Sequence, residues 1–332
     1  MGNSRVGWLF RPLFQTERPV RVTPRSDFLH QLDHFAARFQ EAFAACLTET
    51  PLEGETVRPQ RLMAAMRHAA LNGGKRFRPF LLYASYRACS GKHGDPLLAG
   101  IALECVHCYS LVHDDLPAMD NDDLRRGQPT VHRAYDEATA ILAGDALLTY
   151  AFDLLAQDQV HPDPAVRLAL LRDLARAAGQ GGMVGGQMLD LAAEGRFDPS
   201  QTPRMLDKDA VTQLQKMKTG ALLAYAVDAG AQLAGATARQ RAALAQYAGC
   251  LGSVFQIADD LLDVEADAAT LGKATGKDAA AGKATLVQLL GPAGARAEIE
   301  RLSQEAHAAI AGFDSAGALL HACLDFAGNR SS

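Results

Sequence analysis

Residues 97–120 read LLAGIALECVHCYSLVHDDLPAMD, an apolar, helix-forming run that ends in carboxylates. This composition predicts a helix from 97 to about 116 that delivers Asp114, Asp115 and Asp120 at its C-terminal end. On a regular helix Asp114 and Asp120 would lie about 240° apart around the axis. Pro117 must end or distort the helix, and such a break allows the two carboxylates to converge.

A second acid cluster lies in residues 255–264, FQIADDLLDV, late in a helix predicted over about 237–265. Asp259 and Asp263 are four residues apart, so they lie about 40° apart on the helix and can reach one cation. Asp260 points about 100° away and is expected in a supporting role. One such cluster could be a solvated helix end. Two clusters of hard oxygen ligands without a nearby thiolate favour Mg²⁺.

Basic segments accompany both acid clusters. The run GGKRFRP at 73–79 places three cations in four positions beside a glycine turn, and Arg125 and Arg126 follow the first cluster. Lys218 and Lys273 lie near the key segments of the second half of the chain. Arginine binds phosphate oxygens in a bidentate manner and lysine binds them as a point charge. No P-loop pattern is present, so the combination favours a diphosphate held by Mg²⁺ and cations rather than P-loop nucleotide hydrolysis.

The bulk composition predicts an all-α protein. Of 332 residues 48% are hydrophobic, largely alanine and leucine, and β-branched runs are scarce. The composition is uniform along residues 27–332, so we expect one domain there. We expect a flexible basic extension with five arginines at 1–26. The net charge of −5 argues against nucleic-acid binding. No uninterrupted transmembrane run or signal peptide is evident, and the scattered cysteines fit a reducing cytoplasm.

Helical periodicity continues along the chain. Apolar side chains at 28, 32, 35, 39 and 43 recur at helical spacing and predict one buried face. Cys105 and Cys108 are expected to be helix-packing residues rather than a redox pair. The glycine-rich stretch 181–186 follows no strand, so it predicts a close approach between helices. Residues 117–130 are expected to be a loop, and further helices are predicted over 59–71, 79–88, 135–158, 164–179, 203–217 and 220–234.

Four segments together resemble the trans-isoprenyl diphosphate synthases, and most closely their bacterial-type farnesyl diphosphate synthases. They are GGKRFRP at 73–79, SLVHDDLPAMDNDDLRRGQPTVH at 110–132, MKTGA at 217–221 and FQIADDLLDV at 255–264. The resemblance covers about 27–328. It implies the isoprenoid synthase fold, a large helical bundle around a central catalytic cavity, usually as a homodimer. It also implies that the two acid clusters face each other and bind about three Mg²⁺ ions with the substrate diphosphate.

The resemblance assigns roles by position. The metal ligands would be Asp114, Asp115 and Asp120 of the first cluster and Asp259, Asp260 and Asp263 of the second. The head of isopentenyl diphosphate would be bound by Lys75, Arg78, His107 and Arg126. The allylic diphosphate would contact Arg125, Lys218 and Lys273. Thr219 and Gln256 would lie beside the reacting carbon and act in catalysis with Lys218 and Arg125. Tyr109 and Ser110, five and four residues before Asp114, would limit the length of the product.

These roles predict a cytoplasmic, Mg²⁺-dependent enzyme. It would condense isopentenyl diphosphate with dimethylallyl and geranyl diphosphates to give farnesyl diphosphate. A geranylgeranyl or geranyl diphosphate synthase with the same site is the nearest alternative. A class I terpene cyclase is less favoured, because cyclases typically replace the second cluster by an Asn/Asp–Ser/Thr–Glu pattern. An inactive partner subunit would normally lack one acid cluster or the Lys75/Arg78 pair, and this chain has both.

Overall fold

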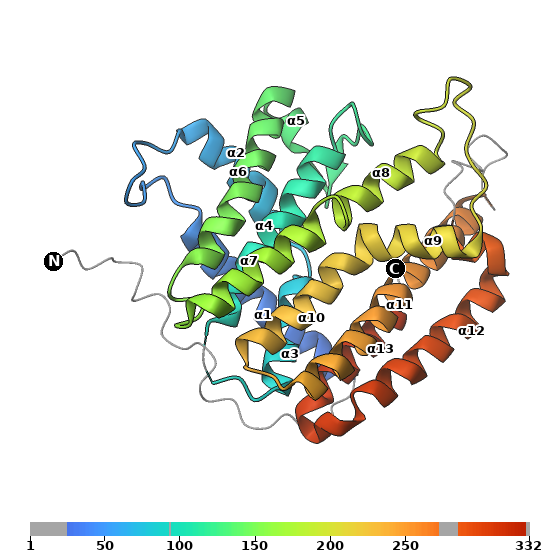
Figure 1. The fold of residues 1–332 in the computed structure, drawn as a ribbon. Coiled ribbons are helices and arrows are strands. Elements are labelled where there is room, and N and C mark those ends of the chain that lie inside the picture. Colours follow the sequence, from blue (N-terminus) through green and yellow to red (C-terminus); the bar gives the residue numbers. More distant parts are fainter. Residues whose placement is uncertain (1–24, 93, 272–284, 330–332) are drawn as a thin grey trace. The chain divides into compact units, whose positions relative to one another are not determined.

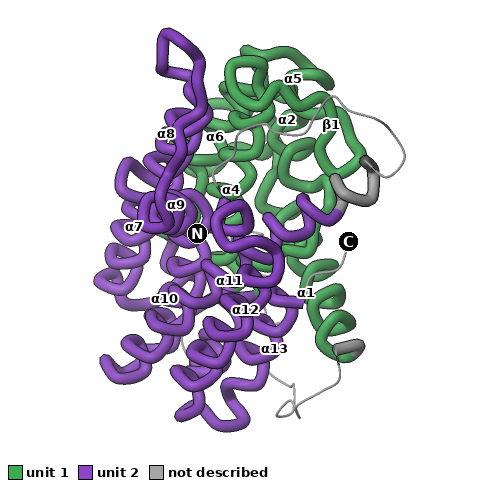
Figure 2. The backbone as a smooth tube through the Cα atoms, turned by 90° about the vertical axis from the view of Figure 1, so that its right-hand side faces the viewer, with its two compact units in different colours: residues 1–80, 97–155 green, residues 81–96, 156–332 purple. Residues whose placement is uncertain are grey.

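The computed structural model describes residues 25–92, 94–271 and 285–329, with side chains from 27 to 265 and again from 285 (Figure 1). The described residues are almost entirely helical, which confirms the predicted all-α class. The chain forms two compact units. Unit 1 comprises residues 1–80 and 97–155, and unit 2 comprises residues 81–96 and 156–332 (Figure 2). The predicted single domain over 27–332 stays a prediction, and most of the predicted extension lies outside the described residues.

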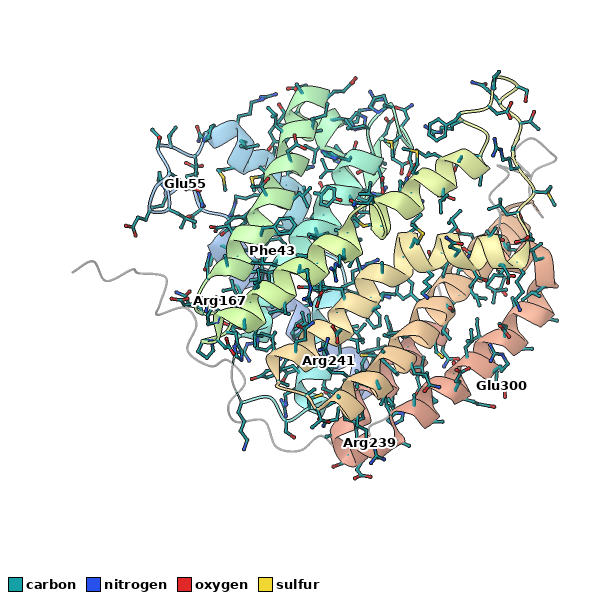
Figure 3. The ribbon with its side chains drawn as sticks, viewed as in Figure 1. Phe43, Glu55, Arg167, Arg239, Arg241 and Glu300 are labelled. Atoms are coloured by element: carbon teal, nitrogen blue, oxygen red, sulfur yellow. The ribbon has the colours of Figure 1, made fainter. Side chains whose placement is uncertain are left out.

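Unit 1 begins with α1 (Arg25–Cys46) and α2 (Gln60–Leu71), and the first turn of α3 (Phe77–Ala88) belongs to it. It continues with α4 (Pro96–Asp114), a hairpin of β1 (Leu124–Arg125) and β2 (Gln128–Pro129), α5 (Val131–Ala134) and α6 (Glu137–Ala156). The predicted apolar face of α1 is confirmed, because none of its five side chains is more than 4% exposed. Phe35 packs its ring edge-on against Phe80 at 5.2 Å, and Phe43 lies inside the unit (Figure 3).

Helix α4 is the core helix of unit 1. Burial raises the pKa of the Cys108 thiol to about 12, and Cys105 is buried beside it. Both thiols are free, which confirms their role in packing. By length and composition α4 and α6 could each cross a membrane, but 72% of the α4 window is buried in the protein. The corresponding fraction for α6 is only 39%. Two such helices are weak indications of a membrane protein.

Unit 2 contains the rest of α3 and a series of packed helices. They are α7 (Pro164–Ala178), α8 (Met183–Ala193), α9 (Lys208–Gln215), the π-helical turn η2 (Lys216–Gly220), α10 (Ala221–Leu233), α11 (Ala238–Leu271), α12 (Leu286–Ala309), the 3-10 segment η3 (Ala311–Gly317) and α13 (Ala318–Gly328). Helix α11 packs against α10, α12 and α13. Helix α8 packs against η2.

Several boundaries differ from the predictions. Helix α4 ends at Asp114, two residues early, and the helix predicted from 203 begins only at Lys208. The hairpin and α5 begin within or beside the predicted loop, and α8 occupies glycine-rich sequence where no helix was predicted. The two helices predicted over 203–217 and 220–234 are one continuous helical segment from Lys208 to Leu233, because η2 joins α9 to α10.

Candidate active site

The first acid cluster is folded into a tight turn after α4. The backbone N–H of Asp120 donates to the carbonyl of Asp114 at 2.8 Å, and that of Met119 donates to Leu116 at 2.8 Å. This turn replaces the helical path after Asp114, so the backbones of Asp114 and Asp120 are adjacent. The side chain of Asp115 is buried, whereas Asp120 is exposed. The break expected at Pro117 is therefore present, one turn earlier than the proline itself.

Arg125 on β1 is bound to acids of the same segment. Its Nε and Nη2 donate to Asp115 Oδ1 at 2.9 and 2.5 Å, and Nη2 donates to Asp122 Oδ2 at 3.0 Å. Burial raises the pKa of Asp115, and the hydrogen bond from Arg125 offsets part of that rise. These three hydrogen bonds hold the half-buried guanidinium of Arg125 in one orientation. The role of Asp122 as a partner was not predicted from the sequence.

Arg126 lies at the tip of the hairpin and packs on the glycine turn of residues 73–74. Its Nη1 donates to the carbonyl of Gly73 and to Asn72 Oδ1, the latter at 3.2 Å. Gly74 has φ +110, and a Cβ there would lie 2.5 Å from Arg126 Nη1. The positive φ favours glycine at position 74, and the absence of a Cβ leaves room for the guanidinium of Arg126. The two predicted cationic segments, 73–79 and 125–126, are therefore in contact.

Arg78 and His107 complete this basic group. Arg78 Nη1 donates to His107 Nε2 at 3.4 Å, and the exposed Lys75 directly follows Gly74. Burial holds the pKa of His107 well below its usual value, and the nearby Arg78 and Arg126 lower it further. A neutral His107 is therefore available as a hydrogen-bonding group. Unit 1 thus brings together the residues predicted to bind isopentenyl diphosphate.

The two residues predicted to limit product length differ in their surroundings. Tyr109 is buried, and its ring stands edge-on to His113 at 5.8 Å. Burial raises the pKa of its phenol to about 12. Ser110 is half-buried and its Oγ donates to the carbonyl of His107 at 2.9 Å. Tyr109 is therefore the larger and more buried of the two side chains, and the role of both in limiting product length stays a prediction.

In unit 2, η2 and α11 share a hydrogen-bonded chain of polar side chains. Thr219 Oγ1 donates to Gln256 Oε1 at 2.7 Å, and Gln256 Nε2 donates to Asp260 Oδ1 at 2.8 Å. Gln215 Nε2 donates to Asp260 Oδ2 at 2.9 Å. These bonds fix the amide of Gln256 with its oxygen toward Thr219. Gln215, the last residue of α9, was not predicted to belong to this site.

The second acid cluster separates into one buried and two exposed carboxylates. Asp260 is 8% exposed, whereas Asp259 and Asp263 are exposed one turn apart on α11. Burial raises the pKa of Asp260 to about 6, and the hydrogen bonds from the two glutamines act against that rise. The arrangement agrees with the helical geometry deduced from spacing, in which Asp259 and Asp263 share one face.

Lys218 is paired with an acid that the sequence analysis overlooked. Its Nζ lies 2.5 Å from Asp190 Oδ2 on α8. A Cβ on Gly186 would lie 2.2 Å from the backbone N of Lys218, so α8 and η2 approach as closely as glycine allows. The predicted close approach at 181–186 is confirmed. This glycine-rich stretch was also the feature of the sequence that could have pointed to Asp190, which lies one turn after Gly186 on α8.

Lys273 lies outside the described residues. Within the described ranges, no three His, Cys, Asp or Glu side chains converge into a preformed metal site. The exposed aspartates are nonetheless oxygen donors of the kind that Mg²⁺ accepts, with coordination shared among carboxylates, waters and substrate phosphates. The donor set therefore fits Mg²⁺.

Comparison with known proteins gives a consistent assignment. A family model described as polyprenyl synthetase matches residues 59–312. The farnesyl diphosphate synthase of Geobacillus stearothermophilus is 44% identical over 263 residues, which are 79% of this chain and 86% of the relative. The chloroplastic geranylgeranyl pyrophosphate synthase 9 of Arabidopsis thaliana is 42% identical, with 78% and 71% of the two chains covered.

Solved structures agree with these sequence relatives. A crystal structure of an FPP/GFPP synthase from Zymomonas mobilis superimposes with a TM-score of 0.78 at 39% identity. The alignment covers 91% of this chain and 99% of the other. A family model that spans most of the chain, and relatives with this identity and coverage, leave one assignment: the chain belongs to the polyprenyl synthetase family.

Proposed function

We propose that this protein is a prenyltransferase that condenses isopentenyl diphosphate with dimethylallyl and then geranyl diphosphate to give farnesyl diphosphate. The observation that supports this most directly is the basic group of unit 1. Arg78, His107 and Arg126 are connected through the turn at 73–74, next to Lys75. A diphosphate head needs such a converging set of cations and neutral donors. The relatives named farnesyl diphosphate synthase support the same assignment.

The first chemical step is the departure of diphosphate from the allylic substrate. About three Mg²⁺ ions, bound by the aspartates of both clusters, would offset the negative charge that develops on the leaving group. Arg125 in unit 1 and Lys218 in unit 2 would each be available to donate hydrogen bonds to diphosphate oxygens. In the structure these cations are held by Asp115 and by Asp190, so each is already oriented before substrate binds.

The second step forms a carbon–carbon bond. Breakage of the C–O bond leaves an allylic cation, which Thr219 and Gln256 stabilise with neutral dipoles. The double bond of isopentenyl diphosphate, fixed by the basic group, attacks that carbon. A proton leaves the adjacent carbon and passes to the released diphosphate, which restores a neutral alkene. Water must be excluded, or the cation would become an alcohol.

Product length follows from the position of Tyr109. Its buried ring lies five residues before Asp114 on α4 and is held against His113. We infer that this ring ends the space for the growing chain after fifteen carbons. Tyr109→Ala would then shift the product toward twenty carbons or longer. A variant that still stops at fifteen carbons would assign chain-length control elsewhere.

One experiment tests the function itself. Purified protein is incubated with Mg²⁺, labelled isopentenyl diphosphate and, in separate reactions, each allylic primer, and the carbon number of the product is measured. A fifteen-carbon diphosphate is expected. A twenty-carbon or ten-carbon product would favour the geranylgeranyl or geranyl synthase. A cyclic hydrocarbon would indicate a terpene cyclase, and a silent protein would indicate a partner subunit.

A matched pair of variants controls this assay. Asp259→Asn should reduce turnover by about a hundredfold or more, because one charge-stabilising ligand is removed. Glu300→Gln removes an exposed carboxylate on α12 and should behave as wild type (Figure 3). Equal activities for both variants would contradict the proposed metal role of the second cluster.

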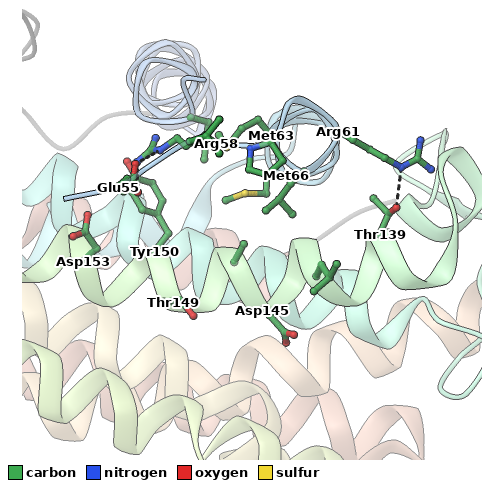
Figure 4. Close-up of a pocket in the computed structure, with 16 residues that line it drawn as sticks. Glu55, Arg58, Arg61, Met63, Met66, Thr139, Asp145, Thr149, Tyr150 and Asp153 are labelled. Carbon is green, nitrogen blue, oxygen red and sulfur yellow. Dashed lines mark hydrogen bonds and ion pairs between the residues drawn. The ribbon is translucent and has the colours of Figure 1, made fainter. Parts of the chain in front are cut away.

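We further propose that the active form is a soluble, cytoplasmic homodimer. Helix α6 is mostly apolar, and its exposed side carries Ile141 at 45% and Leu142 at 58% exposure next to Asp145. Beside this exposed side an apolar groove of about 800 Å³ lies between α2 and α6 (Figure 4). Leu142 and Met66 are among its lining residues. An exposed, mostly apolar face beside a groove suits contact with a second copy of the chain.

A further inference from the structure

Arg76 differs from the two cations that surround it in the GGKRFRP segment. Its side chain is 3% exposed, whereas Lys75 is exposed and Arg78 is partly buried. Its backbone has φ +49, a left-handed conformation that is uncommon for arginine. Burying a guanidinium costs several kcal/mol unless it is fully paired. The groups that bind the Arg76 guanidinium must therefore account for its burial in this strained turn.

The partners of Arg76 come from three helices of unit 1. Its Nη1 donates to Glu104 Oε1 on α4 at 2.7 Å. Its Nη2 donates to Gln40 Oε1 on α1 and to the carbonyl of Ala70 on α2, both at 2.6 Å. The guanidinium also lies 5.9 Å from the ring centroid of Phe43. One side chain thus fixes the turn at 73–76 to the core of the unit.

The same pair controls where the substrate-binding groups lie. Arg76 stands between Lys75 and Arg78 in sequence. Glu104, which is 2% exposed, precedes His107 by three residues and so lies on the adjacent turn of α4. Arg78 Nη1 and His107 Nε2 meet at 3.4 Å. The ion pair therefore sets the distance between the loop and the helix that together supply the basic group.

We propose that Arg76, through Glu104, is a positioning residue for the isopentenyl diphosphate pocket. This inference rests on the proposed function. Arg76 does not touch substrate; it holds Lys75 and Arg78 at the correct distance from His107. Stability alone is a poor explanation, because a buried ion pair can often be replaced by apolar side chains of similar volume without loss of stability. The two explanations therefore predict different behaviour when the whole pair is removed.

The test compares single and double variants. Arg76→Met leaves Glu104 buried and unpaired, so this variant should be unstable and is not informative alone. The double variant R76M/E104M removes both charges and should be clearly more stable than Arg76→Met, although Gln40 and the carbonyl of Ala70 each lose a donor. Its KM for isopentenyl diphosphate should nonetheless rise about tenfold or more, because the binding groups are misplaced. Its KM for the allylic primer should stay within about twofold of wild type.

Two further variants define the result. R301M/E298Q removes an exposed ion pair on α12 and should match wild type in both KM values. Arg76→Lys keeps the charge but loses the planar fork, so it should show an intermediate KM for isopentenyl diphosphate. A folded double variant with unchanged KM values, or with both raised equally, would overturn the positioning role. A wild-type protein without prenyltransferase activity would instead overturn the proposed function.

Discussion

At the scale of single residues, the two cations predicted to contact the allylic diphosphate, Arg125 and Lys218, are each paired with acidic side chains. Asp115 and Asp122 hold Arg125, and Asp190 holds Lys218. Sequence motifs pointed to both cations but not to all of the acids that hold them. Motif spacing predicts residues that lie one or two turns apart. Asp190 and Lys218 are separated by 28 residues and meet only because α8 packs on η2.

The hydrogen bond between Thr219 and Gln256 leads to a prediction about turnover. Thr219→Val keeps the shape of the side chain and removes the hydroxyl that donates to Gln256 Oε1 at 2.7 Å. We expect kcat to fall about tenfold or more, because one dipole beside the developing cation is lost and the amide of Gln256 is released. The KM values should change little. Steady-state kinetics with both substrates measures this effect.

Thr212→Val is the matched control for that variant. Thr212 also lies on the α9–η2 segment, but its Oγ1 donates to the carbonyl of Lys208 at 2.7 Å, within its own helix. This control should retain wild-type kcat. If Thr219→Val also kept wild-type kcat, the polar chain that ends at Asp260 would be structural and not catalytic.

His107 gives a prediction about pH. Because its pKa is depressed in the folded protein, the unfolded chain binds a proton at this residue below about pH 6.5, whereas the folded protein does not. The stability that His107 contributes is therefore complete above that pH and is lost as the pH falls below it, by up to about 1.4 kcal/mol per pH unit. Denaturant unfolding from pH 7.5 to 5 measures this slope.

The comparison for His107 requires two substitutions. His107→Gln should flatten the acid limb of the stability curve, because the titrating group is gone. His34→Gln, at an exposed position on α1, should leave the wild-type slope unchanged. Parallel curves for wild type and His107→Gln would show that His107 is not buried in its neutral form.

At the scale of elements, the sequence predicted long helices well and short or irregular elements poorly. The apolar period of α1 and the proline-induced end of α4 were deducible from local rules. The hairpin was missed because its strands have two residues each, too few for a visible alternation. Its turn residues Arg126 and Gly127 both have positive φ, yet arginine is an unusual first residue for such a turn.

The contact between α8 and η2 leads to a prediction about packing. In Gly186→Ala the new Cβ would meet the backbone N of Lys218 at 2.2 Å, and backbone cannot move aside as a side chain can. We expect a loss of about 1–3 kcal/mol in the free energy of unfolding. Turnover should fall as well, because Lys218 and Thr219 would be displaced. Thermal denaturation and kinetics measure the two effects.

Gly249→Ala provides the reference for that substitution. Gly249 lies exposed within α11, and a Cβ there would meet no atom within 4 Å. Alanine should stabilise the helix by about 0.5–1 kcal/mol. If Gly186→Ala were as well tolerated as Gly249→Ala, the close approach of α8 to η2 would not govern the position of Lys218.

At the scale of the whole molecule, the residues predicted to form the active site are distributed between two compact units, and each unit contains its own set. Unit 1 contains the first acid cluster and the basic group, and unit 2 contains the second cluster with Lys218, Thr219 and Gln256. Sequence motifs identified both sets, because each is built on one or two local segments. The buried supports Arg76, Glu104 and Gln215 were missed, because burial depends on packing between distant segments. The opposition of the two clusters stays a prediction.

The exposed side of α6 leads to a prediction about assembly. Leu142 is 58% exposed and lines the α2–α6 groove, so Leu142→Glu should disturb no core contact within the unit. In a homodimer that uses this face, a glutamate from each copy would be buried in the interface, at a cost of several kcal/mol. Sedimentation velocity should show a dimer for wild type and a monomer of unchanged thermal midpoint for the variant. Met205→Glu, at a 94% exposed position in unit 2, should remain dimeric. A monomeric wild type, or a dimeric Leu142→Glu protein, would exclude this face as the interface.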